Sequence, residues 1–173
     1  CDTVATLQRG MVWTHIYSTA GIVYADKPVA VSQLSRGVQC SGFWQNGDPT
    51  LLNLLPEGLY TRKAAVKVPK RTGTGMAFSS NSLLVITRAG QSNQIRLNGA
   101  SLSNVVHNPL GQRWEYSRVS VKPDSTCRLE SDSADFQAYL YGFDFANAYS
   151  SWVAYDRMVQ DTATDLAALS VPE

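Results

Sequence analysis

Charged residues are scarce in this 173-residue sequence: Asp, Glu, Lys and Arg make up 17%, below the roughly one quarter usual for soluble domains. Fifteen basic against fourteen acidic side chains leave a net charge of +1, and the basic residues cluster only at 67–71. Because affinity for a phosphate backbone needs several clustered cations, nucleic acid is not expected as a partner. A surface so poor in charge relies on Ser, Thr, Asn and Gln, as in many secreted β-proteins.

Long hydrophobic runs are also missing. No stretch approaches the roughly 20 consecutive apolar residues of a transmembrane helix, so membrane insertion is not expected. The chain begins at Cys1 rather than Met and shows no signal peptide, which indicates a processed form or a piece of a longer protein. A lipid-carrying N-terminal cysteine, as in bacterial lipoproteins, is an alternative to a domain boundary.

Cysteine occurs three times, which allows one disulfide and leaves one thiol over. We expect a bridge between Cys40 and Cys127, because each lies beside a polar loop where a bridge could tie two strand ends together. The other two pairings involve Cys1, and three reduced thiols in a cytosolic protein are a further alternative. With no CxxC and only His15 and His107 as histidines, the sequence predicts no zinc site.

Catalytic patterns are absent too. There is no G-x-S-x-G nucleophile elbow, and the one alternative is a thiol nucleophile at Cys40 with His15 or His107 as its base. A disulfide explains Cys40 with fewer assumptions. We therefore expect no enzymatic activity, no catalytic residue and no cofactor.

What the sequence does have is alternation of apolar and polar residues, broken by Gly, Pro and Asn, which is typical of strands and tight turns. Segments 81–90 and 93–102 predict a hairpin, and Asn98-Gly99 a second tight turn. The remaining expected strands cover residues 11–17, 21–25, 28–34, 114–122 and 136–143.

This pattern predicts an all-β fold, an antiparallel β-sandwich of jelly-roll or immunoglobulin-like type, or two small packed sandwiches. Residues 1–155 would form the sandwich, with a candidate division in the loop-like stretch 67–82. Residues 156–173 would form a tail or at most one short C-terminal helix.

Aromatic residues in predicted loops are the best candidates for a binding site. Glycan binding uses aromatic faces stacked on sugars beside amide and carboxylate groups. Two groups have this chemistry: Phe43, Trp44, Gln45, Asn46 and Asp48 in one loop, and Tyr149 with Trp152 near the C-terminus. The alternative is that such aromatics belong to the core, where most Trp and Tyr of a sandwich lie.

An acidic cluster comprises Glu130, Asp132, Asp135 and the nearby Asp144. Oxygen ligands at alternating positions can hold calcium weakly in extracellular modules. We favour the alternative of a solvated turn, in which Asp and Ser cap their own backbone, and expect no metal.

Four blocks in order carry a family resemblance: "VYADKPVAVSQLS", "GDPTLLNLLPEGLY", "LLVITRAGQSNQIRLNGASL" and "WEYSRVSVKPDSTCRLESDSADFQAYLYGFDFANAYS". Over roughly residues 10–155 the chain resembles the N-terminal domain family of the IgGFc-binding protein. The resemblance implies a β-sandwich binding or adhesion domain of secreted mucus proteins and of large bacterial extracellular proteins, without a catalytic motif. It departs from the family at Cys127, where histidine is usual, and in the closing block around Tyr149.

The expected function is therefore a non-enzymatic recognition or adhesion module, outside the cell or at its surface, that binds glycans or glycoproteins on a cell surface or in mucus. Two alternatives stay open: a structural spacer with no ligand of its own, and the tip domain of a phage or bacterial fibre.

Overall fold

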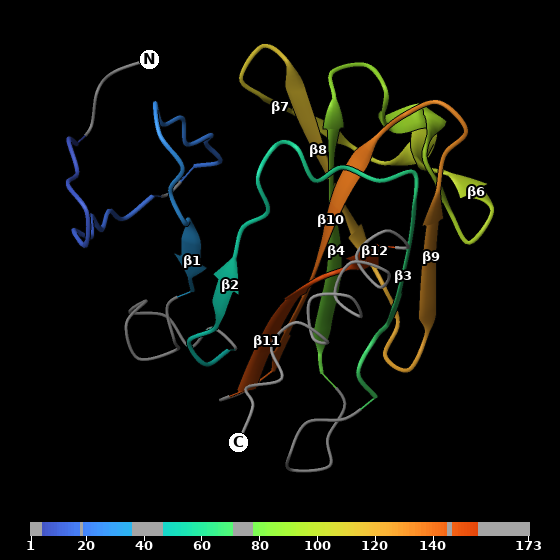
Figure 1. Ribbon diagram of the computed structural model, residues 1–173. Coiled ribbons are helices and arrows are strands. Elements are labelled where there is room, and N and C mark those ends of the chain that lie inside the picture. The colour runs from blue at the N-terminus through green and yellow to red at the C-terminus, as the bar shows by residue number, and fades with distance from the viewer. Residues whose placement is uncertain (1–4, 18, 36–46, 71–77, 145–146, 156–173) are drawn as a thin grey trace, which may run out of the picture.

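The computed structural model describes residues 5–17, 19–35, 47–70, 78–144 and 147–155, and Figure 1 shows their arrangement. Within these residues the regular elements are strands and two short 3-10 turns, and every strand pair is antiparallel. The predicted all-β, antiparallel class is confirmed, and two five-stranded sheets form the β-sandwich.

The larger sheet, which we call sheet I, has the strand order β11-β10-β4-β8-β7. Its strands are β4 (Ser80–Arg88), β7 (His107–Leu110), β8 (Trp114–Ser120), β10 (Phe136–Asp144) and β11 (Asn147–Trp152). The two nine-residue strands β4 and β10 lie next to each other inside the sheet, so both are paired along their two edges. Sheet I is therefore built on one long central ladder.

The facing sheet, which we call sheet II, has the order β12-β3-β9-β5-β6 and shorter strands. They are β3 (Lys63–Lys67), β5 (Arg96–Leu97), β6 (Ala100–Ser101), β9 (Thr126–Glu130) and β12 (Ala154–Tyr155). A separate pair, β1 (Ser32–Leu34) with β2 (Leu51–Asn53), stands to one side of the sandwich in Figure 1. The 3-10 turns are η2 (Ser92–Gln94) and η3 (Leu102–Asn104).

The core lies between the two sheets, because alternate side chains of each strand point to the same face. In sheet I, Leu83 is opposite Leu140 and Val85 is opposite Ala138, and all four are buried. The complete cluster is Ala64, Val68, Leu83, Val85, Ile95, Leu102, Cys127, Leu129, Ala134, Phe136, Ala138, Leu140 and Val153. Burying each large aliphatic side chain contributes about 1.5–3 kcal/mol, which makes this cluster the main source of stability.

The predicted hairpin between segments 81–90 and 93–102 is wrong. Strand β4 pairs with β8 and β10 in sheet I, whereas β5 pairs with β6 and β9 in sheet II. The turn η2 carries the chain from one sheet to the other. The second predicted turn is confirmed: Asn98 and Gly99 have φ values of 50° and 84°, and join β5 to β6.

The strands expected at 11–17 and 21–25 are not formed, and the strand expected at 28–34 is reduced to residues 32–34. The physical reason is that alternation tells which side chains share a face, whereas a strand also needs a neighbouring backbone to pair with. Among the described residues, 12–17 make no backbone hydrogen bond to any other segment.

Residues on both sides of the stretch 67–82 pack in one core cluster, since Ala64 precedes the stretch and Leu83 and Val85 follow it. The C-terminal tail expected at 156–173 lies outside the described residues. In the described part of the chain, no helix is long and apolar enough to cross a membrane.

Candidate functional site

The first group of predicted binding residues lies mostly outside the described part of the chain: of Phe43, Trp44, Gln45, Asn46 and Asp48, only Asp48 is described, and it is exposed. Its neighbour Gly47 anchors the end of this segment on the β10–β11 hairpin. Gly47 is buried with a φ of 122°, and a Cβ added there would lie 2.8 Å from Cδ1 of Phe143. Only glycine fits both the backbone angle and the close approach.

Strand β11 links this anchor to the second group of candidates. Ala148 at its start is the other near neighbour of Gly47, and Trp152 is its last residue. The side chain of Trp152 is 42% exposed, and in register it is opposite Tyr139 of β10. One strand therefore has Asp48 near its first residues and an exposed indole at its end.

Tyr149, the other predicted binding residue of β11, serves the fold instead. Its hydroxyl donates a 2.8 Å hydrogen bond to Oδ1 of the buried Asn81, and its ring meets Phe78 edge-on at 4.7 Å between centroids. The ring covers Gly142, its partner in register, so closely that a Cβ there would be 1.9 Å away. Burial, with a smaller effect of Cys127, raises the pKa of Tyr149 to about 12.

Side chains on the outward face of β10 form hydrogen bonds to β1 and to the segment that follows β2. The hydroxyl of Tyr139 accepts a 3.1 Å hydrogen bond from the backbone N–H of Leu55. Gln137 donates a 2.7 Å hydrogen bond to the carbonyl of Pro56, and the hydroxyl of Tyr141 donates one of 3.1 Å to Oε1 of Gln33. Burial raises the pKa of Tyr141 to about 12 and keeps that of Tyr139 above its usual value. These bonds hold β1, β2 and the segment after β2 beside the surface of β11.

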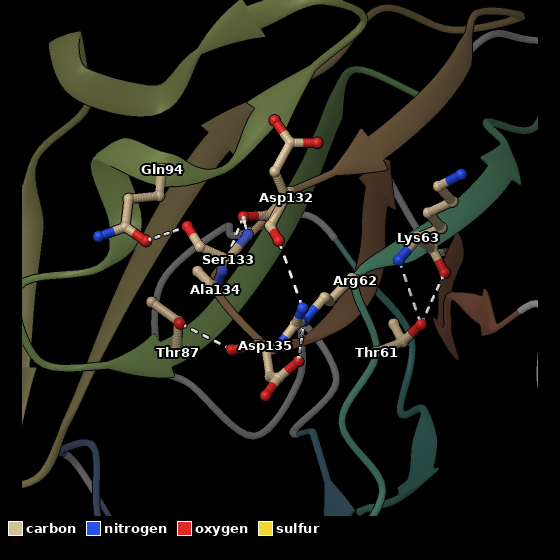
Figure 2. Close-up of polar contacts among 10 residues, drawn as sticks. Thr61, Arg62, Lys63, Thr87, Gln94, Asp132, Ser133, Ala134 and Asp135 are labelled. Atoms are coloured by element: carbon tan, nitrogen blue, oxygen red, sulfur yellow. Dashed lines mark hydrogen bonds and ion pairs between the residues drawn. The ribbon is translucent and has the colours of Figure 1, made fainter.

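The acidic cluster is closed by arginines rather than open to a cation, and Figure 2 shows one of them, Arg62, against Asp135. Nε of Arg62 is 2.8 Å from Asp135, and Nη1 of Arg96 is 3.0 Å from Asp132. The hydrogen bond and charge of Arg96 keep the pKa of Asp132 below its usual range. Glu130 lies 3.6 Å from Nε of Arg96.

The turn of this cluster also binds its own backbone, as the solvated-turn interpretation expected. The hydroxyl of Ser131 accepts hydrogen bonds from the N–H groups of Ser133 and Ala134, at 3.3 and 2.9 Å. Asp144 does not belong to the cluster, because it is buried at the opposite end of β10. In the described ranges, no group of three or more His, Cys, Asp or Glu side chains is placed to hold a metal ion.

The expected bridge from Cys127 to Cys40 is not present. Cys127 has a free thiol, and it is 2% exposed on the inner face of β9 rather than beside a polar loop. Burial raises the pKa of this thiol, and a hydrogen bond with Ser125 lowers it by a smaller amount. The thiol therefore acts as a small apolar side chain of the core. Cys40 and Cys1 lie outside the described residues.

Sequence reasoning missed a buried polar pair between β7 and β8. Nδ1 of His107 lies 2.7 Å from the hydroxyl of Ser117, its partner in register, and Nε2 of His107 is buried without a partner. Ser92 lies 3.5 Å from Ser117, and its N–H donates to Glu115 at 2.8 Å. The pair has the chemistry of a nucleophile and a base, but Ser117 is 0% exposed. The hydroxyl of Ser117 is therefore closed to solvent in this structure. The two residues come together only through the pairing of β7 with β8, which local sequence patterns do not show.

Comparison with known families gives one match: the family described as IgGFc binding protein matches residues 2–142. This range contains β1 to β9 and most of β10, and ends before β11. No curated protein and no solved structure was found to match the chain.

Proposed function

Because the chain belongs to the family described as IgGFc binding protein, we propose that it is a non-enzymatic extracellular recognition module for a glycan or glycoprotein partner. The family description names the binding of a protein, which supports a protein or glycoprotein partner. The proposed contact surface, which we call the β11 surface, comprises Asp48, the outward side of β11 and Trp152.

The observation that carries this proposal is the exposed indole of Trp152 on a rigid strand. Tryptophan is a frequent binding hot spot because it offers a large flat face with few rotatable bonds. Trp152 is 42% exposed and open to solvent, while the partly buried Tyr149 and its hydrogen bond to Asn81 hold the strand that carries it. A side chain held in place before binding loses less entropy when the ligand arrives.

Asp48 adds the polar half of the surface. A carboxylate beside aromatic rings accepts hydrogen bonds from sugar hydroxyls, and Asp48 is exposed next to the anchor at Gly47. The same geometry supports a protein partner, whose backbone N–H groups and hydroxyls donate to a carboxylate in the same way.

The non-enzymatic part of the proposal is supported by the place of the nucleophile and base pair. Ser117 is 0% exposed on β8 inside sheet I, and His107 beside it on the edge strand β7 is partly buried. A buried serine of this kind satisfies the hydrogen-bonding needs of its neighbours and does not attack a substrate.

The test is a binding measurement on immobilised glycoproteins, including a mucin, before and after enzymatic removal of the sugars. We expect Trp152→Ala to weaken binding about tenfold or more, in line with hot-spot tryptophans, with an unchanged melting temperature. The matched control is Val106→Ala, which removes another exposed apolar side chain, 75% exposed and placed before β7. Trp44→Ala tests the binding role that the sequence predicts for Trp44.

The outcomes separate the competing functions. Binding that is lost after sugar removal supports a glycan ligand, and binding that persists supports the protein itself. If the native chain bound none of the glycoproteins, or if Trp152→Ala bound as well as the native chain, the β11 surface would not be the site. The structural spacer would then explain the chain better.

A further inference from the structure

Residues 11–17 form an extended segment that is apolar on both faces and exposed. Trp13, His15 and Tyr17 lie on one face, where the first two rings stack at 5.2 Å and His15 meets Tyr17 edge-on at 4.5 Å. The opposite face has Val12 and Ile16, which are 87% and 69% exposed. Strands that are apolar on both faces are found inside proteins, covered on each side.

Among the described strands, the pair β1–β2 lacks a neighbour on the outer edge of β1. Its ladder extends from Val31 to Ser35 through hydrogen bonds to Leu54 and Thr50, and among the described residues β1 has a neighbour on one edge only. A two-stranded pair is marginally stable in water, and an open edge is a template for another strand. Next to this edge, Leu34 and its partner in register Leu51 are 68% and 64% exposed.

The chain thus has a strand-forming segment without a partner and an open sheet edge without a neighbour. Within the described residues the two are not paired with each other. Two copies of the chain can satisfy both needs by exchange, because each copy supplies what the other lacks. Exchange of an identical element between copies is a route to dimers that requires no new structure.

The apolar area is large enough for such an assembly. The exposed large side chains of this region, each 36% to 87% exposed, are Met11, Val12, Trp13, Ile16, Tyr17, Val23, Tyr24, Val29, Leu34 and Leu51. At ~150–250 Å² for a whole aromatic side chain and less for an aliphatic one, they expose on the order of 1,000 Å². A stable interface buries about 800 Å² per partner.

We propose that residues 11–17 add as a strand to the open edge of β1 in a second copy, and that the reciprocal exchange forms a homodimer. The exchange covers the apolar N-terminal region and extends each two-stranded pair to three strands. It leaves β11 outside the interface, so the dimer would present two recognition surfaces and bind a multivalent partner with avidity.

The experiment is sedimentation velocity of the full chain over a wide concentration range, with three variants. The native chain is expected to sediment at twice the mass of one chain. The double variant Val12→Lys with Ile16→Lys places charge on the exchanged strand and is expected to be monomeric. Thr14→Pro leaves the apolar side chains but removes a backbone donor, so it is also expected to be monomeric.

Val106→Lys, at an exposed apolar position outside this region, is the control and is expected to stay dimeric. Circular dichroism and thermal unfolding establish that each variant retains the sandwich, whose core contains none of these residues. A native chain that is monomeric at every concentration would overturn the proposal and mean that a different polypeptide covers the segment. A dimer that persists unchanged in the double variant and in Thr14→Pro would overturn it as well.

Discussion

Replacing Gly142 with alanine tests whether Tyr149 is part of the fold, as its contacts indicate. A Cβ at position 142 would lie 1.9 Å from Cε1 and 2.5 Å from Cζ of Tyr149, which is shorter than any tolerated contact. Because the two residues are opposite each other in the β10–β11 register, the ring has to leave its place.

The size of the expected loss of stability follows from the two contacts that the displaced Tyr149 ring loses. It loses the 2.8 Å hydrogen bond to Oδ1 of Asn81, which is 5% exposed, and leaving this buried amide oxygen without a partner costs about 1–3 kcal/mol. It also loses the edge-on contact with Phe78, worth about 0.5–1.5 kcal/mol. We therefore expect Gly142→Ala to lower the free energy of unfolding by about 2–4 kcal/mol.

Urea unfolding followed by tryptophan fluorescence measures this difference. The control is Gly58→Ala, because a Cβ at Gly58 meets nothing within 4 Å and should change stability by less than ~0.5 kcal/mol. In a Tyr149→Ala background the clash is absent, so Gly142→Ala should cost less than about 1 kcal/mol there. An equal cost of Gly142→Ala in both backgrounds would refute the reasoning.

Three further predictions concern other sites. The thiol of Cys127 should stay unreactive towards a thiol reagent in the native chain and react on unfolding, because it is buried; fast native reaction at this position would contradict the core placement. Burial raises the pKa of Glu115, but the hydrogen bonds from Ser92 and Gly90 together outweigh it, so the pKa is lowered. The stability that the ionised Glu115 adds to the fold is therefore complete above pH 4.5 and is lost as the pH falls through the lowered pKa. Urea midpoints measured from neutral to acidic pH should therefore fall less steeply in Glu115→Gln than in the native chain. Calcium should leave the melting temperature unchanged, because Arg96 already pairs with Asp132; a rise on adding calcium that a chelator reverses would argue for a metal site.

The sequence could predict those parts of the fold that depend on residues close together along the chain. The turn at Asn98-Gly99 follows from the tolerance of both residues for positive φ, and alternation alone indicated strands β4, β8 and β10. Which strands pair is decided by contacts between distant segments. The expected hairpin failed for this reason, because η2 sends the chain to the other sheet.

The candidate site shows the same division. Residue chemistry singled out Asp48 and Trp152, which are exposed, but it could not distinguish them from Tyr149, which turns inward over Gly142. The pairing of Arg62 with Asp135, 73 positions apart in sequence, was also beyond local reasoning. The cross-strand register decides which of these side chains meet, and local sequence patterns do not reveal that register.

The central claim is tested most directly by nuclear magnetic resonance of the backbone amides. The chain is titrated with a glycopeptide taken from a glycoprotein that it binds. The account predicts that the resonances of the backbone amides of Asp48 and of residues 148–152, and of the indole N–H of Trp152, shift together and saturably. The amide resonances of sheet II should not shift. Shifts confined to sheet II, or to the β7–β8 region around Ser117, would contradict it.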